Sequence, residues 1–138
     1  MKTSKSFNIY IVTTNTLYGQ SLKQFLETNL DKNIHVQTFS TAESCVNEIG
    51  SWEIKPDIIV LDHYLNATTK SGIDELHTVD RIKQMSPKTM IIVLSNESDM
   101  AHATKTLCFG ACDYVPKDQF VFSHILNSVQ DCLQPSKL

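Results

Sequence analysis

Three apolar runs in this chain each end on a polar residue whose side chain could take part in chemistry. Asp62 follows one run, Ser95 follows the next, and Lys117 follows a third. If these runs are neighbouring parallel strands, their carboxyl ends share one edge of the sheet, which is where such sheets bind ligands. A carboxylate, a hydroxyl and an ammonium would then meet there. This combination favours an aspartate that accepts a phosphoryl group, because a hydroxyl and an ammonium can stabilise the added charge of about −2.

The first apolar run, residues 7–12, is followed by Thr13 and Thr14 and not by acidic residues. Magnesium takes near-octahedral oxygen coordination and is commonly held by one or two carboxylates. Neutral hydroxyls are poor substitutes, so a metal beside Asp62 should be held weakly. A single carboxylate also meets little repulsion from like charges. We therefore expect a direct ion pair between Asp62 and Lys117.

The elements that must position these residues are read from the hydrophobic pattern. Short β-branched runs alternate with longer amphipathic segments, which predicts five strand–helix units. The expected strands are residues 7–12, 34–39, 57–61, 90–94 and 114–115. The third and fourth are apolar throughout, as central strands of a parallel sheet must be. Parallel strands with right-handed crossovers give an α/β fold, a doubly wound five-stranded sheet with helices on both faces.

Local signals mark the starts of several helices. Residues 40–43 have the spacing of a capping box, which opens a helix at Ser40. Ser95 and Asn96 offer caps for the helix after the fourth strand, and Asp118 offers one for the last helix. In the first helix, Leu17 is expected to share one apolar face with Leu22, Phe25, Leu26 and Leu30.

Composition sets bounds on what the chain can do. It has 138 residues, of which 41% are apolar and 20% charged, with a formal net charge of −3. This favours one globular domain over residues 1–138, with a core at about 7–133 and short flexible tails. No basic tract suits nucleic acid, and no apolar stretch is long enough to span a membrane. The first six residues lack the apolar part of a signal peptide, so we expect a cytoplasmic protein.

The four cysteines are expected to be reduced thiols. They are Cys45, Cys108, Cys112 and Cys132. No CxxC pair and no nearby histidine completes a metal site around them. A cytoplasmic protein keeps such thiols reduced.

The chain resembles a response-regulator receiver domain of two-component signalling from Phe7 to about Leu133. The resemblance is carried by residues 56–62 (PDIIVLD), 91–95 (IIVLS) and 110–117 (GACDYVPK). It implies the flavodoxin-like form of the α/β fold. Receiver domains are signalling modules, so the chain is not expected to be an enzyme.

The resemblance also implies a role for each site residue. Asp62 would be the phosphoacceptor, taking its phosphoryl group from a histidine kinase or a phosphotransfer protein. Ser95 and Lys117 would contact the phosphoryl oxygens, and Tyr114 would be the aromatic switch that follows Ser95 inward. The phosphorylated domain would act by contact with a downstream protein, because no output domain follows Leu133. The face of the last helix would serve as a surface for a partner or for a homodimer.

The sequence departs from the receiver pattern around the phosphoacceptor. Thr13 and Thr14 replace the acidic pair of the family, so the implied magnesium would be weakly bound by Asp62 and the backbone carbonyl of Tyr64. The loop after Asp62 is longer than usual and polar. Asp118 stands where the family has a proline. Tyr64 and Glu97 lie two residues after Asp62 and Ser95, where side chains could control the access of water to an acyl phosphate.

Two other functions compete with phosphoacceptance. The first is a pseudo-receiver, an interaction module with the same fold that acts without phosphorylation. The second is an enzyme or a small-molecule binder on a flavodoxin-like sheet. It is the weaker one, because the 4 glycines form no phosphate-binding GxGxxG or P-loop motif. Labelling with acetyl phosphate and magnesium distinguishes phosphoacceptance from the pseudo-receiver function.

Overall fold

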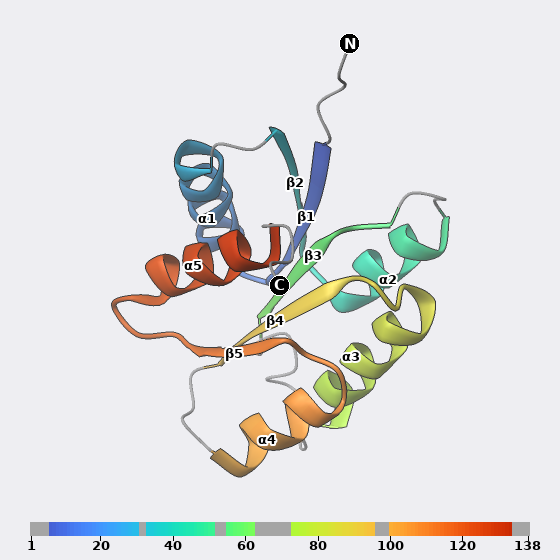
Figure 1. Ribbon diagram of the computed structural model, residues 1–138. Coiled ribbons are helices and arrows are strands. Elements are labelled where there is room, and N and C mark those ends of the chain that lie inside the picture. The colour runs from blue at the N-terminus through green and yellow to red at the C-terminus, as the bar shows by residue number, and fades with distance from the viewer. Residues whose placement is uncertain (1–5, 31–32, 52–54, 63–72, 96–99, 134–138) are drawn as a thin grey trace, which may run out of the picture.

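The computed structural model describes residues 6–30, 33–51, 55–62, 73–95 and 100–133. Strands and helices alternate along the whole chain, as the hydrophobic pattern predicts (Figure 1). The elements are β1 (Ser6–Val12), α1 (Thr16–Asn29), β2 (Asn33–Phe39), α2 (Ala42–Ser51), β3 (Ile58–Asp62), α3 (Ile73–Met85), β4 (Met90–Ser95), α4 (Met100–Cys108), β5 (Asp113–Pro116) and α5 (Val121–Leu133).

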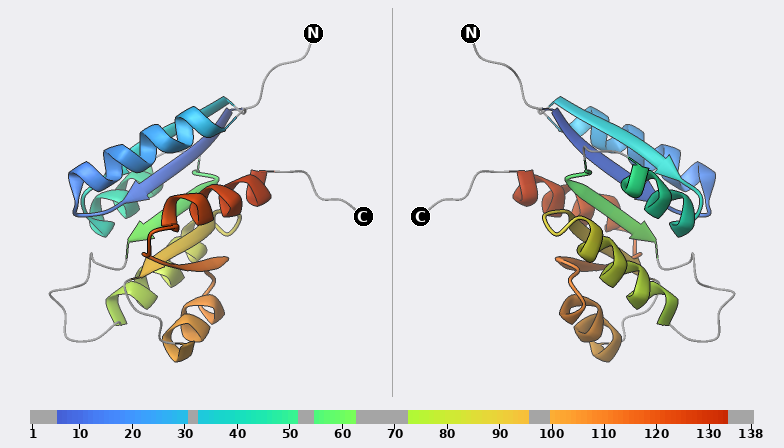
Figure 2. Two further views of the ribbon diagram at one scale, coloured as in Figure 1. Left: turned by 90° about the vertical axis from the view of Figure 1, so that its left-hand side faces the viewer. Right: turned by 90° about the vertical axis from the view of Figure 1, so that its right-hand side faces the viewer.

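The five strands form one parallel sheet in the order β2-β1-β3-β4-β5. Figure 2 shows its two faces: α1 and α5 cover one, while α2 and α3 cover the other. The helix α4 lies beside α3, at the edge formed by β5 (Figure 1). The predicted doubly wound α/β fold is therefore confirmed. Within the described part of the chain, every helix is too short or too polar to cross a membrane.

Each face of the sheet has its own core, because successive side chains of a strand point to opposite sides. Under α1 and α5, Ile9 and Ile11 of β1 pack with Leu22 and Leu26 of α1. On the opposite face, the neighbouring strand residues pack against α2 and α3. They include Tyr10, Val12, Ile59, Leu61, Ile91 and Val93. The central strands β3 and β4 are buried on both faces, which explains their continuous apolar sequence.

The apolar face of α1 differs from the predicted one in its first turn. Leu17 is 77% exposed, whereas Gly19, Leu22 and Leu26 are buried. Leu17 precedes Leu22 by five residues, which on a helix of 3.6 residues per turn places it well off the buried stripe. The expectation for Leu17 was wrong because it followed residue type more closely than helical spacing.

One of the predicted helix starts also needs correction. Thr41, and not Ser40, caps α2, because its Oγ1 accepts a hydrogen bond of 3.0 Å from the backbone N–H of Ser44. The caps predicted at Ser95 and Asn96 stay a prediction, because residues 96–99, between β4 and α4, lie outside the described residues. Asp118 does act at the start of the last helix, where its Oδ1 accepts from the backbone N–H of Phe120 at 2.9 Å.

Candidate functional site

The sheet brings Asp62, Thr13 and Lys117 to the same edge and the same face. Asp62 ends β3, while Thr13 and Lys117 directly follow β1 and β5. Each of the three stands two residues after a strand side chain that packs beneath α1 and α5. Those side chains are Val60, Ile11 and Val115. Because side chains alternate along a strand, the three polar residues point toward the α1 and α5 side.

The ion pair predicted between Asp62 and Lys117 is present. The Lys117 Nζ lies 3.1 Å from Oδ1 and 3.0 Å from Oδ2 of Asp62. The Asp62 side chain is only 2% exposed and that of Lys117 12% exposed. The backbone holds Lys117 in place, since its N–H donates to the carbonyl oxygen of Ser95 at 2.7 Å. A buried carboxylate is thus paired with one ammonium across the sheet edge.

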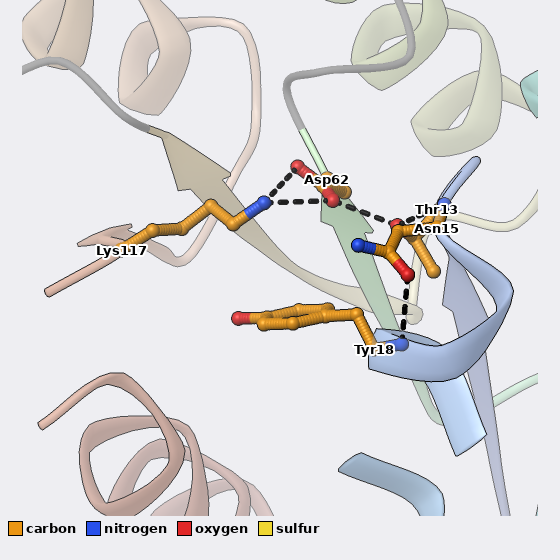
Figure 3. Close-up of polar contacts among 5 residues, drawn as sticks. All are labelled: Thr13, Asn15, Tyr18, Asp62 and Lys117. Atoms are coloured by element: carbon orange, nitrogen blue, oxygen red, sulfur yellow. Dashed lines mark hydrogen bonds and ion pairs between the residues drawn. The ribbon is translucent and has the colours of Figure 1, made fainter. Parts of the chain in front are cut away.

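Thr13 completes the contacts of the carboxylate from the other side (Figure 3). Its Oγ1 donates a hydrogen bond of 2.8 Å to Asp62 Oδ2 and accepts one of 3.2 Å from the backbone N–H of Asn15. An acidic side chain at this position would repel Asp62, whereas a hydroxyl can donate to it. Thr13 is buried, while Thr14 is exposed. The two threonines at the acid-pair positions therefore have different surroundings.

Gly19 allows α1 to pack against this threonine. A Cβ atom at Gly19 would lie 3.0 Å from the Thr13 methyl group. The methyl group faces the helix, while the hydroxyl is directed at Asp62. The close approach of α1 therefore supports the rotamer in which Thr13 donates to the carboxylate.

Tyr18 of α1 lies beneath the ion pair and was not identified from the sequence. The Lys117 Nζ is 4.6 Å from the centroid of the Tyr18 ring, within the range of a cation–π interaction. The ring also contacts Phe122 of α5, with centroids 5.5 Å apart. The signal was available, because Tyr18, Leu22 and Leu26 recur every four residues and so lie on one helix face.

The Tyr18 hydroxyl is buried and has no hydrogen-bond partner among the described residues. Burial, together with the negative charge of Asp62, raises the pKa of Tyr18 from 10.0 to about 12. The side chain therefore stays neutral at physiological pH. Its contribution to the site is an aromatic surface under the ammonium group.

Of the other residues that the sequence predicted for the site, the structure describes two. Ser95 is fully buried at the end of β4, one position beyond Leu94, which pairs with Asp62. Tyr114 lies in β5 opposite Val93 and packs against the core on the α2 and α3 side. Its role as a switch remains a prediction. Tyr64 and Glu97, predicted to control water access, lie outside the described residues.

The donor set fits magnesium poorly. No cluster of three or more histidine, cysteine, aspartate or glutamate side chains suited to a metal occurs in the described part of the chain. Both oxygens of Asp62 already accept hydrogen bonds from Lys117, and Oδ2 accepts a further one from Thr13. A hard cation that prefers several anionic oxygens would have to displace these donors.

Comparison with known proteins agrees with the fold. A family model described as the response regulator receiver domain matches residues 9–130. The BeF3-activated receiver domain of DrrB, a Thermotoga maritima protein, is 27% identical with a TM-score of 0.75, and the match covers 95% of this chain and 100% of that one.

Two more distant structures share the fold. HP1043, an orphan response regulator of H. pylori, is 15% identical with a TM-score of 0.77, over 96% of this chain and 100% of that one. A Burkholderia pseudomallei response regulator, solved with a phosphorylated aspartic acid, a calcium ion and citrate, is 21% identical with a TM-score of 0.71, over 93% of this chain and 66% of that one. Since the family model covers most of the sequence, the chain belongs to the response-regulator receiver family.

Proposed function

We propose that this receiver domain accepts a phosphoryl group on Asp62 from a histidine kinase or a phosphotransfer protein, and that it binds magnesium poorly. The observation that supports this most directly is the contact of Lys117 with both oxygens of the buried carboxylate, at 3.0 and 3.1 Å. Ser95 stands at the end of the adjacent strand β4. A carboxylate, an ammonium and a hydroxyl can each take part in phosphoryl transfer to aspartate.

In the proposed reaction, a carboxylate oxygen of Asp62 attacks the phosphorus atom of the donor. The new P–O bond forms as the P–N bond to the donor imidazole breaks, and the imidazole takes up a proton. Lys117 then moves from the carboxylate to a phosphoryl oxygen, and the Ser95 hydroxyl donates to another. Stabilisation by charges placed in advance is the usual main source of catalysis in such transfers.

We propose that this reaction is slow, because Thr13 and Thr14 stand at the positions of the acidic pair. Thr13 is neutral and donates to Asp62 Oδ2, so this hydrogen bond must break or weaken when that oxygen reacts. Lys117 is then the main cation that offsets the charge of the phosphoryl group. We propose that the output passes, in the cytoplasm, through contact with a downstream protein or a second copy of the chain.

The test is labelling with acetyl phosphate and magnesium, followed by intact mass. We expect the mass of one phosphoryl group to be added to the chain and to be absent in Asp62→Asn. The matched control is Asp118→Asn, because Asp118 is exposed and asparagine can keep its cap. This control should label as the parent does. Absence of any adduct at millimolar magnesium would refute the proposal.

The second candidate function is an interaction module that acts without phosphorylation. It is favoured by the burial of Asp62, which is 1% exposed, and by the hydrogen bonds it accepts from Thr13 and Lys117. A buried and well-paired aspartate can serve structure alone. If the parent does not label but Thr13→Asp with Thr14→Asp does, the missing part was the metal site. If neither labels, the interaction module stands.

A further inference from the structure

A pair of cysteines lies at the end of the sheet opposite to Asp62. Cys112 precedes β5, and its backbone N–H donates to the Ile91 carbonyl oxygen at 2.8 Å. Cys132 lies in the last turn of α5. Both line one open cavity of about 230 Å³, whose other walls are Met90, Asp113, Ser128 and Asp131. The two cysteines are 20 positions apart in the sequence, so only the packing of α5 on the sheet brings them together.

The chain is turned away from α4 before it reaches Cys112. Gly110 has φ of +123°, a conformation that favours glycine. Cys108 therefore remains on α4, whereas Cys112 follows the turn and faces α5. A spacing of four residues would suggest one helix face for these two cysteines, but the turn separates them. The partner of Cys112 is Cys132.

The two thiols differ in environment. Cys112 is exposed and Cys132 is half-buried. Interaction with the neighbouring Cys132 thiol lowers the pKa of Cys112, and Lys83 acts in the same direction. The same interaction, together with burial, raises the pKa of Cys132. An exposed thiol whose pKa is lowered, beside a second thiol, has the character of a redox-active pair.

We propose that Cys112 and Cys132 are an oxidation site that forms a reversible disulfide with hydroperoxides. The Cys112 thiolate attacks a peroxide oxygen, so that an S–O bond forms, the O–O bond breaks, and the leaving hydroxide or alkoxide takes a proton to become water or an alcohol. The Cys132 sulfur then attacks the Cys112 sulfur. The S–S bond forms, the S–O bond breaks, and water leaves with the thiol proton. Two thiols are oxidised by two electrons, and the peroxide is reduced.

The bridge would join the end of α5 to the start of β5. The opposite end of β5 leads directly into Lys117, the residue that pairs with Asp62. A disulfide between these cysteines therefore restrains β5, the strand that also positions Lys117 beside Asp62. The inference does not depend on phosphorylation, because the cysteines lie at the other end of the strands.

The test treats the purified chain with hydrogen peroxide and then blocks free thiols. We expect the parent to lose the mass of two hydrogens before blocking, and to yield after blocking a linked peptide pair containing Cys112 and Cys132. Reduction with dithiothreitol should reverse the change. Cys132→Ala should stop at the sulfenic acid, which dimedone traps on Cys112, and Cys112→Ser should give neither product. Asp62→Asn should form the bridge as the parent does, which separates this inference from phosphoacceptance.

Two other cysteines are internal controls. Cys45 is buried, and burial with the charge of Glu48 raises its pKa to about 12, so it should remain unmodified. Cys108→Ser should leave the bridge unchanged. The proposal is overturned if peroxide leaves the mass of the parent unchanged, if the linked peptides contain Cys108, or if the bridge joins two chains.

Discussion

Replacing Lys117 by methionine should destabilise the domain by about 3–5 kcal/mol, the usual cost of leaving one partner of a buried ion pair alone. Asp62 is 1% exposed, so the carboxylate cannot regain water without local opening. Two unit charges about 4 Å apart interact by about 4 kcal/mol at an effective dielectric constant of about 20. The Thr13 hydrogen bond to Oδ2 remains in the variant, so we expect the lower part of the range. Domains of this kind have a total stability of about 5–15 kcal/mol.

The assay is urea unfolding followed by far-ultraviolet circular dichroism, with a double-mutant cycle. The four proteins are the parent, Lys117→Met, Asp62→Asn and the double variant. We expect Lys117→Met to lose less stability in the Asp62→Asn background, with a coupling energy of about 3 kcal/mol. The loss should change little with salt, because buried pairs are weakly screened. Lys88→Met is the matched control, because Lys88 is exposed in the turn after α3, and its effect should stay within about 0.5 kcal/mol.

The reasoning is refuted by a coupling energy below about 1 kcal/mol, which is the value of solvent-exposed ion pairs. It is also refuted if Lys117→Met and Lys88→Met have the same effect. Either result would mean that the carboxylate is stabilised by something other than the ammonium group.

Further predictions concern the residues around the carboxylate. Thr13→Asp places a second carboxylate beside Asp62, so the melting temperature should fall without divalent cations and recover with millimolar magnesium by ligand linkage. Gly19→Ala should lower the urea midpoint, because its Cβ would lie 3.0 Å from the Thr13 methyl group. In a Thr13→Ser background, which lacks that methyl group, the same change should raise stability by about 1 kcal/mol. Tyr18→Leu should lose about 1–2 kcal/mol of cation–π and packing energy in the same assay, whereas Tyr18→Phe keeps the ring. The pKa of Tyr18 is raised to about 12, so the folded chain holds this proton more tightly than the unfolded chain does. The associated stability is complete below about pH 10 and is lost as pH rises toward 12. The decline should be shallower in Tyr18→Phe, and equal slopes would contradict the assignment.

The amino-acid sequence predicted the order of the elements and the sheet edge at which the candidate site forms. The apolar runs in β3 and β4 are too short for buried helices and too continuous for exposed strands, so they had to be central parallel strands. Because the carboxyl ends of parallel strands share one edge, Asp62, Ser95 and Lys117 are expected to lie together from their places in the sequence. The ion pair followed from charge alone, because one acid and one lysine were left to face each other.

Packing of the elements against one another fixes the contacts that depend on helix rotation and strand register. Thr13 appeared in the sequence as a missing acid, but strand alternation and the approach of α1 at Gly19 make it a hydrogen-bond donor to Asp62. The buried residues of α1 fix the rotation of the helix about its axis. In this orientation Tyr18 lies under Lys117, while the neighbouring Leu17 is exposed to water. Cys112 and Cys132 share a cavity because α5 packs back across the sheet. Local patterns determine elements, because short-range periodicity creates their apolar faces. Contacts between residues distant in the sequence arise only when those faces pack together.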